Sequence, residues 1–319
     1  MASWQAKLTS AFIRLYFKRQ PSGNESEAVI YWRSKMEMPE FLRPHISNDI
    51  TVERIQEDFI KGEWIRLNSA SPNTVYYLHG GGYVAGSPAT HRPFTAAIGR
   101  RAKTRVFALD YRLAPENRFP AAIEDAVSGY RWLLAEGVKP EQIVIGGDSA
   151  GGGLTIATLV SLRDAGLRLP RAAFCISPWT DLQGTGQSLV TNNERDPMFY
   201  GNGIAHLGKV YAGNKPLNDP LVSPIYADLG GLPPLKIYVS DSEVLLDDSI
   251  RLAERARECG VEVDLHIWEN MVHVWPVFVG FGLPEAHKAI EEIAEFIQTQ
   301  IALESPIPSI ASLAETLTC

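Results

Sequence analysis

Ile143-Val-Ile-Gly-Gly-Asp-Ser-Ala-Gly-Gly-Gly153 is the stretch that decides the fold of this chain. Its first three apolar residues predict a buried strand of a parallel sheet, and the apolar run 154–162 that follows predicts a helix. The turn between them, Gly147-Asp-Ser-Ala-Gly151, has the G-x-S-x-G pattern of a nucleophile elbow, which holds a serine oxygen at a tight corner between strand and helix. We therefore predict Ser149 as a catalytic nucleophile, in preference to a glycine-rich turn in which this serine caps the helix.

The composition, with 45% hydrophobic and 21% charged residues, is typical of a soluble globular protein. The 319 residues carry a net charge of -7, which argues against nucleic acid or an anionic membrane surface as the main partner. No apolar run reaches the roughly 18 residues of a membrane span, so we expect no stable membrane insertion. The three cysteines are scattered and show no metal-binding spacing, and the N-terminus does not resemble a signal peptide. These features predict a cytoplasmic protein.

Predicted strands alternate with helices along most of the chain. The strand patterns lie at residues 50–55, 63–67, 74–78, 106–109, 143–145, 172–176, 235–239 and 263–268. The first two alternate as strands exposed at a sheet edge do. Helices are predicted between the later strands, and the alternation indicates a mostly parallel sheet covered on both faces. An edge position for the last strand would let it pair with a second copy, so a homodimer is one expectation.

Two segments fall outside this alternation. Near the N-terminus, five large apolar side chains recur at helical spacing: Trp4, Leu8, Phe12, Leu15 and Tyr16. Such an amphipathic helix can lie on a membrane, but we favour a helix that packs this stripe on the rest of the protein. Residues 183–228 are polar and irregular, and an insertion of this length at the end of a sheet is where a lid would sit.

A nucleophilic serine needs a base that takes its proton. His273 lies in Glu269-Asn-Met-Val-His-Val-Trp275, directly after the last strand, where the loop faces the elbow. We therefore predict His273 as the base, and we expect His79, in the glycine run after the third strand, to tie down that loop. The remaining histidines are expected to be structural or at the surface: His45, His91, His206, His266 and His287.

The third member of such a triad is a carboxylate that orients the histidine. It should follow the strand 235–239, because the chain order in these folds is serine, acid, histidine. Asp247 and Asp248 open the next helix, where capping and the helix dipole account for them. The choice on these grounds lies between Asp241 and Glu243.

The run His79-Gly-Gly-Gly82 suits the binding of a negatively charged oxygen. Glycines have no Cβ, so their backbone N–H groups can approach a substrate closely and stabilise the oxyanion of a tetrahedral intermediate. The N–H of Ala150, directly after the serine, is the other predicted donor.

Six segments resemble the hormone-sensitive-lipase-like family of α/β-hydrolases, in its microbial esterase branch. They are His79-Gly-Gly-Gly-Tyr83, Tyr111-Arg-Leu-Ala-Pro-Glu116, Phe119-Pro-Ala-Ala122, Gly147-Asp-Ser-Ala-Gly-Gly152, Ser177-Pro-Trp-Thr-Asp181 and Met271-Val-His-Val-Trp275. The resemblance runs from about Ile50 to Ile301. It implies an α/β fold with an eight-stranded, mostly parallel sheet, helices on both faces and a helical cap. It also implies hydrolysis of short-acyl esters through an acyl-enzyme, without cofactor or metal, and oxyanion donors at Gly81 and Gly82 beside Ala150.

The resemblance also implies a division of the chain and a register for the acid. We expect cap helices in 1–48, a catalytic core in 49–182 and 229–303, a cap insertion in 183–228, and a tail in 304–319. The usual acid segment of the family reads Asp-Pro-Leu-x-Asp-Glu. Aligned on Glu243-Val-Leu-Leu-Asp-Asp248, it puts Glu243 at the catalytic acid and Val244 at the proline. We favour Glu243, with Asp241 second, because the start of the helix fixes the register.

Several further residues are assigned by their place in these motifs. We expect Asp110, Tyr111, Arg112, Glu116 and Asp148 to form a buried charge network that braces the two loops. Aromatic side chains are predicted to line the pocket for a small ester: Tyr83, Phe199, Tyr200, Trp275 and Phe278. Rival hypotheses are an amidase, a long-chain lipase, or a binding protein like the plant hormone receptors that resemble this family but lack the histidine.

Overall fold

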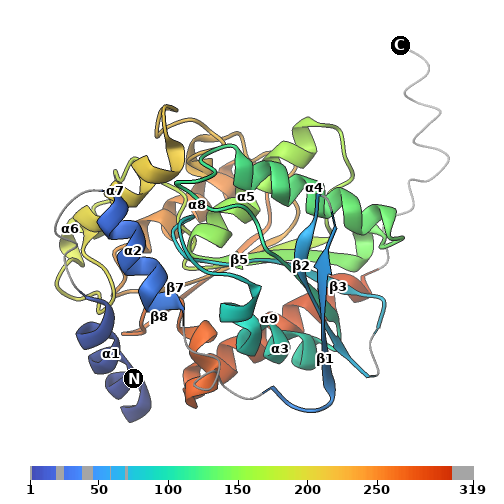
Figure 1. Cartoon of the computed structure of the whole chain (residues 1–319), viewed down its shortest axis with the longest axis horizontal. Coiled ribbons are helices and arrows are strands. Elements are labelled where there is room, and N and C mark those ends of the chain that lie inside the picture. Colours follow the sequence, from blue (N-terminus) through green and yellow to red (C-terminus); the bar gives the residue numbers. More distant parts are fainter. Residues whose placement is uncertain (1, 19–24, 38–45, 58, 69–70, 304–319) are drawn as a thin grey trace.

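An eight-stranded sheet runs through the middle of the described part of the chain, which comprises residues 2–18, 25–37, 46–57, 59–68 and 71–303 of a computed structural model (Figure 1). The strand order is β1-β2-β4-β3-β5-β6-β7-β8. Only the β1–β2 and β2–β4 pairs are antiparallel. The strands are β1 (Ile50–Gln56), β2 (Lys61–Leu67), β3 (Thr74–Leu78), β4 (Arg105–Leu109), β5 (Ile143–Asp148), β6 (Ala172–Ile176), β7 (Leu235–Ser240) and β8 (Val263–Trp268). The predicted α/β-hydrolase fold is confirmed.

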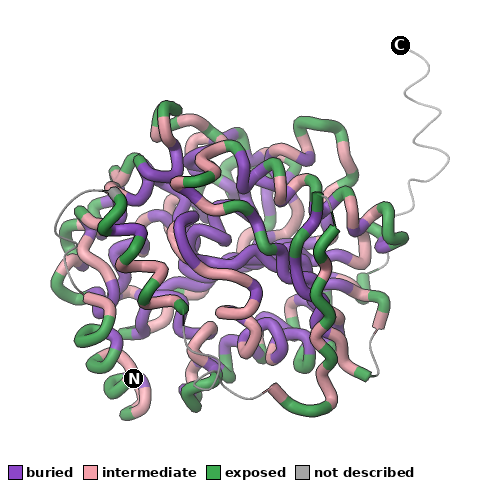
Figure 2. The backbone as a smooth tube through the Cα atoms, in the orientation of Figure 1, coloured by how far each residue is buried: buried purple, intermediate pink, exposed green. Residues whose placement is uncertain are grey.

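Helices cover both faces of this sheet, because its central strands are apolar on both sides. In β3, Val75 and Tyr77 face one core while Tyr76 and Leu78 face the other, as the two-residue period of a strand requires. The first core is closed by α3 (Pro88–Ala102) and α9 (Pro284–Ala302). The second is closed by α4 (Ala121–Ala135), α5 (Ala150–Asp164) and α8 (Leu246–Glu258). Figure 2 shows the strands as a buried layer between these helices.

The second strand differs from its prediction. β2 was expected at an exposed edge, but it lies between β1 and β4, and Trp64 and Ile65 are buried. Trp64 packs against Phe107 and Trp132, whose rings lie 5.1 and 6.2 Å from its own. Glu63, which made this strand look half polar, is also buried and pairs with Arg92 at 2.6 Å. β1 and β8 form the two edges of the described sheet.

The N-terminal helices lie beside the insertion that follows β6 (Figure 1). The helices of this region are α1 (Trp4–Phe17), α2 (Glu25–Met36), α6 (Ser188–Thr191) and α7 (Gly201–Ala212). Elsewhere in the chain or at the end of the insertion, short 3₁₀ turns form η2 (Pro140–Gln142), η3 (Pro224–Tyr226) and η4 (Trp275–Phe281). The side chain of Arg14 donates to Glu194 O at 2.8 Å, which joins α1 to the insertion. Within the described ranges, no helix is both long and apolar enough to cross a bilayer. His45 and the predicted tail 304–319 lie outside the described residues.

The two acids at the start of α8 also differ from their prediction. Neither caps the helix: the cap residue is Leu245, and no side chain bonds there. Asp248 is buried and accepts the backbone N–H groups of Thr180 and Asp181, each at 2.8 Å. Asp247 accepts the N–H of Ser188 at 2.9 Å. The two carboxylates therefore join α8 to the segment after β6. Capping preferences alone do not predict such long-range hydrogen bonds.

Candidate active site

Ser149 sits at a strained corner between β5 and α5. Its φ of +53° and ψ of -121° lie in a region that residues with a Cβ rarely adopt. The corner can form because its flanking residues are glycines. A Cβ on Gly147 would lie 2.3 Å from Gly151 O, and one on Gly151 would lie 2.0 Å from Leu78 O. Each glycine of the G-x-S-x-G pattern is thus required because a neighbouring backbone carbonyl lies too close for a side chain.

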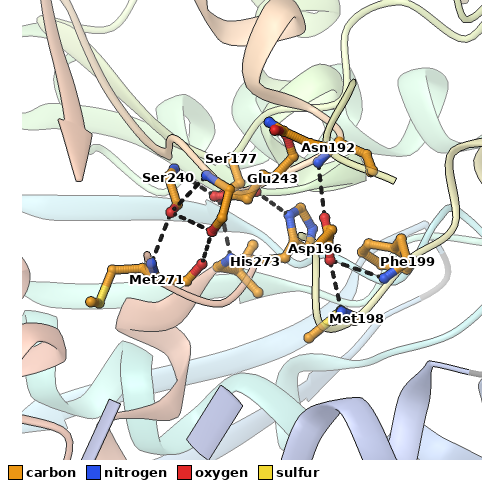
Figure 3. A network of polar contacts seen from close by, with 12 residues as sticks. Ser177, Asn192, Asp196, Met198, Phe199, Ser240, Glu243, Met271 and His273 are labelled. Atoms are coloured by element: carbon orange, nitrogen blue, oxygen red, sulfur yellow. Dashed lines mark hydrogen bonds and ion pairs between the residues drawn. The ribbon is translucent and has the colours of Figure 1, made fainter. Parts of the chain in front are cut away.

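Glu243 and His273 form a buried pair. His273 Nδ1 lies 2.6 Å from Glu243 Oε2, and both side chains are almost completely shielded from solvent (Figure 3). The other carboxylate oxygen, Oε1, accepts the Ser240 N–H at 2.7 Å and the Ser177 hydroxyl at 2.8 Å. The Ser177 oxygen in turn accepts the N–H of Val274 at 3.2 Å. These hydrogen bonds hold the Glu243 carboxylate against the loop that carries His273.

Electrostatics of this pair favour a positive imidazole. Burial lowers the pKa of His273, but the charge and hydrogen bond of Glu243, with the charges of Asp196 and Asp148, outweigh it and leave the pKa above its usual value. Burial raises the pKa of Glu243, although the positive charge of His273 opposes it. A carboxylate held against an imidazole fixes its tautomer and stabilises its cation.

Asp241, the rival acid, lies elsewhere. Its Oδ2 pairs with Arg195 Nη2 at 3.0 Å at the surface, and its Oδ1 accepts the N–H of Asn270 at 2.7 Å. It makes no bond to His273. The loop after β7 therefore turns Glu243 inward and Asp241 outward.

Ser149 and His273 line the same cavity. His273 Nε2 is buried and bonds to no group in the described part of the chain, so the serine–histidine hydrogen bond is not formed in this structure. Such bonds are often long before substrate binds and tighten in the complex. The unpaired nitrogen is available to a proton donor in the cavity.

The glycine run borders the cavity on its other side. Gly81 and Gly82 have φ values of +126° and +62°, and both line the cavity. A Cβ on Gly81 would lie 2.1 Å from Ala85 O, which only glycine avoids. Among the described residues, the N–H groups of Gly81, Gly82 and Ala150 donate to no protein acceptor. Free N–H groups at a helix start suit a negatively charged oxygen.

A buried carboxylate holds the glycine run in place. Asp148 accepts the N–H of Gly80 at 2.8 Å and the hydroxyl of Tyr77, and it pairs with His91 Nε2 at 3.4 Å. Burial would raise the pKa of Asp148, but the charge and hydrogen bond of His91 leave it lowered. His79 stacks on Tyr111 with 4.2 Å between ring centres, and its Nδ1 lies 2.8 Å from Gly80 O. His91 is thus a buried partner of the elbow strand.

The predicted single network of five residues is wrong in part. Asp148 and Tyr111 are buried, but Asp110 and Arg112 are exposed. Arg112 pairs with Asp125 and Glu124 at the protein surface. Glu116 pairs with Arg33 of α2 at 2.6 Å. The loop after β4 reaches the protein surface within a few residues, so its charged side chains do not all meet at one buried site.

The cavity has a volume of about 570 Å³ and a mostly apolar wall. Phe199 and Phe278 lie on this wall as predicted, whereas Tyr83, Tyr200 and Trp275 do not. Trp275 is completely buried against Trp268, and Tyr83 stacks on Tyr211 with 3.7 Å between ring centres. Aromatic residues beside a motif can turn into the core as readily as into the cavity. Unpredicted wall residues come from the N-terminal helices: Leu8, Phe12, Ile13, Trp32 and Met36.

Sequence reasoning also missed Asp196, in the insertion. This carboxylate is completely buried and accepts the N–H groups of Met198, Phe199 and Val244 at 2.7, 3.0 and 2.9 Å (Figure 3). Val244 directly follows Glu243, and the ring of Phe199 meets that of His273 edge-on at 5.0 Å. The only signal in the sequence is an Asp-Pro pair, which also occurs in ordinary turns. Within the described residues, no cluster of three or more His, Cys, Asp or Glu could hold a metal ion.

Comparisons with known proteins find similar sequences over most of the chain. A family described as alpha/beta hydrolase fold matches residues 75–277. The chain is 44% identical to an acetyl-hydrolase of Streptomyces hygroscopicus over 237 residues, which cover 74% of this chain and 79% of the relative. It is 34% identical to an esterase of Acinetobacter venetianus over 238 residues, which cover 74% and 78%.

Solved structures are similar over nearly the whole chain. An esterase from the bacterial hormone-sensitive lipase family has a TM-score of 0.86 and 43% identity, and the match covers 95% of this chain and 100% of that one. EstE5 soaked by p-nitrophenyl butyrate has a TM-score of 0.87 and 42% identity, with the same coverage.

Proposed function

We propose a mechanism and a substrate class for this chain from the premise that it belongs to the hormone-sensitive-lipase-like family of α/β-hydrolases and is a carboxylic ester hydrolase. The observation that carries the mechanism is the 2.6 Å contact between Glu243 and His273, on a cavity that also holds a strained serine. These groups can together generate a nucleophile and stabilise the charge that its attack creates.

In the first half of the reaction, Ser149 Oγ attacks the ester carbonyl carbon while His273 Nε2 takes its proton. Glu243 stabilises the resulting imidazolium. The carbonyl oxygen becomes an oxyanion that accepts hydrogen bonds from the N–H groups of Gly81, Gly82 and Ala150. The carbonyl re-forms, the bond to the alcohol breaks, and the alcohol leaves with the proton of His273. The acyl group stays on Ser149.

In the second half, water replaces the alcohol. His273 takes a proton from the water as its oxygen attacks the acyl carbon, and the same N–H groups hold the second oxyanion. The Ser149 oxygen leaves with that proton, and the carboxylic acid is released. Phe199 and Phe278 on the cavity wall contact the apolar parts of the ester.

Replacement of Ser149 tests the mechanism directly. We expect Ser149→Ala to lower kcat by roughly 10⁶-fold toward p-nitrophenyl butyrate, as in other triads. Phenylmethylsulfonyl fluoride should add one sulfonyl group to the wild type and none to the variant, as measured by mass spectrometry. Ser161→Ala is the matched control, because that hydroxyl lies on the same helix and donates to Ala157 O within it. Near-normal turnover by Ser149→Ala would refute the assignment.

The proposed substrates are esters of short acyl chains. The 44% identical relative is an acetyl-hydrolase, which favours this class over long-chain esters and amides. We expect kcat/KM on a series of p-nitrophenyl esters to fall once the acyl chain exceeds about eight carbons, because a cavity of about 570 Å³ limits the acyl chain that it can hold. A flat or rising profile would contradict short-chain selectivity and favour a lipase.

Location and assembly complete the proposal. We propose a cytoplasmic homodimer, and the support is the composition together with β8 at the edge of the described sheet. An uncovered edge strand offers its backbone groups to a second copy.

A further inference from the structure

An apolar stripe on α1 is exposed. It consists of Trp4, Leu8, Phe12 and Leu15, which helical spacing places on one face. Leu15 is 90% and Trp4 67% exposed, and the other two are more than half exposed. The expectation that this stripe packs on the protein is therefore wrong: only Ala6 and Ile13, on the opposite face, are buried. Clustered exposed apolar side chains mark interaction surfaces.

Polar contacts fix α1 in this orientation. At its start, the N–H and hydroxyl of Ser3 donate to the carboxylate of Glu285 at 2.7 and 2.9 Å. At its end, Lys18 Nζ donates to Asn193 O at 2.6 Å and to Asp196 O at 2.7 Å. The helix is held at both ends, so the outward direction of the α1 stripe is built into the fold.

The stripe is continuous with the active-site cavity. Leu8 and Phe12 are more than half exposed, and both also line the cavity that contains Ser149. Phe281 of η4 has the same two properties. Apolar side chains therefore extend from the cavity that holds the serine to the outer surface, and an ester in an apolar layer would meet them on its way in.

The charges of α1 match a lipid surface. The helix contains no Asp or Glu, and it carries Lys7 and Arg14, with Lys18 directly after its end. Basic residues beside Trp, Phe and Leu form the pattern of helices that lie in the interfacial layer of a bilayer. Because the whole chain has a net charge of -7, burial of the apolar face must drive the contact and the cations add to it locally.

We propose that α1 docks on the surface of a lipid bilayer, with the α1 stripe in the headgroup layer, and presents the mouth of the cavity to esters dissolved in that layer. The nature of the substrate rests on the proposed function, but the docking itself does not. A bilayer is favoured over a second copy because Leu8 and Phe12 of the stripe lie at the cavity itself, where a second copy would block the entry of substrate.

The test is sedimentation of the full-length protein with vesicles. We expect the wild type to bind phosphatidylcholine vesicles, and more strongly those with added phosphatidylglycerol. Trp4→Asp and Leu15→Asp should each weaken binding at least tenfold. Neither residue lines the cavity, so turnover of soluble p-nitrophenyl acetate should not change. Phe59→Asp is the matched control: Phe59 is 86% exposed and lies outside the stripe, and its loss should leave binding unchanged.

Two results would overturn the proposal. One is a wild type that stays in the supernatant with both kinds of vesicle. The other is equal vesicle binding by the wild type and Leu15→Asp together with a lower molecular mass of the variant, which would assign the stripe to a second copy. Ser149→Ala should bind vesicles like the wild type, so failure of the catalytic mechanism and failure of docking are measured separately.

Discussion

At the residue scale, Glu243 lies against His273 although its side chain is one methylene longer than an aspartate. Its backbone N–H bonds to Ser240 O at 3.2 Å, and its carboxylate reaches past Ser240 and Ser177 to the imidazole. Three donors hold the two oxygens, so the extra methylene adds little freedom. Ser177 itself has a φ of +46°, and it bridges the carboxylate and the loop that carries His273.

Alanine substitutions at Glu243 and Asp241 separate the two candidate acids. We expect Glu243→Ala to lower kcat by roughly 10⁴-fold, because the imidazole loses both its orientation and the charge that stabilises its cation. Asp241→Ala should change kcat by less than tenfold, since Asp241 makes no bond to His273 and pairs instead with Arg195 at the surface. The measurement is steady-state turnover of p-nitrophenyl butyrate. A crippled Asp241→Ala beside an active Glu243→Ala would reverse the assignment.

At the element scale, Asp196 joins the insertion to the loop after β7. All three hydrogen bonds of its side chain have a carboxylate oxygen as acceptor, and they oppose the burial that raises the pKa of this group. Through Val244 it reaches the proposed acid, and through Phe199 it reaches the cavity wall beside His273. We infer that it is a positioning residue that makes the wall and the acid loop move together.

Asp196→Asn tests this positioning. An asparagine keeps one acceptor but loses the other, and an unpaired buried N–H costs about 1–3 kcal/mol, so we expect kcat/KM to fall roughly 10- to 100-fold. The negative charge of Asp196 raises the pKa of His273, which must be neutral to accept a proton. Its loss should therefore move the acid limb of the pH–rate profile to lower pH.

The shift of the acid limb in Asp196→Asn is interpreted against a control variant and against the other charges near His273. Asp219→Asn is the control variant. Asp219 lies in the same insertion, and its carboxylate accepts the N–H of Leu221 at 2.9 Å. This variant should leave the acid limb of the pH–rate profile in place. The charged groups that face Asp196 and His273 are Glu243, Asp148 and Lys18, with the Arg195–Asp241 pair at the surface. An unchanged acid limb in Asp196→Asn would reduce Asp196 to a structural role.

At the scale of the whole molecule, β8 is the feature that bears on assembly. It forms an edge of the described sheet, and Ile267 on this strand is nearly half exposed. We expect light scattering to give about twice the 35.2 kDa of one chain, and Ile267→Asp to give a monomer. Leu15→Asp should keep the mass of the dimer, because α1 is assigned to a different surface. A wild-type monomer would exclude assembly through this edge.

The sequence by itself determined the elbow and the sheet, because both depend on neighbours within a few residues. Two glycines around a serine, an apolar triplet before it and an apolar run after it fix the turn locally, and regular periods fix the strands. The six motifs then identified the family and put Glu243 ahead of Asp241. The roles of the site residues stay predictions.

Only the tertiary structure decided which way the side chains face. Trp275 turned into the core and Phe278 into the cavity, although they are only three residues apart in a 3₁₀ segment that kinks at Phe278. Asp196 approached His273, and Leu8 approached the cavity of Ser149, across large separations in the chain. A local pattern sets the conformation of its own segment, whereas burial and contact depend on segments that the pattern does not contain.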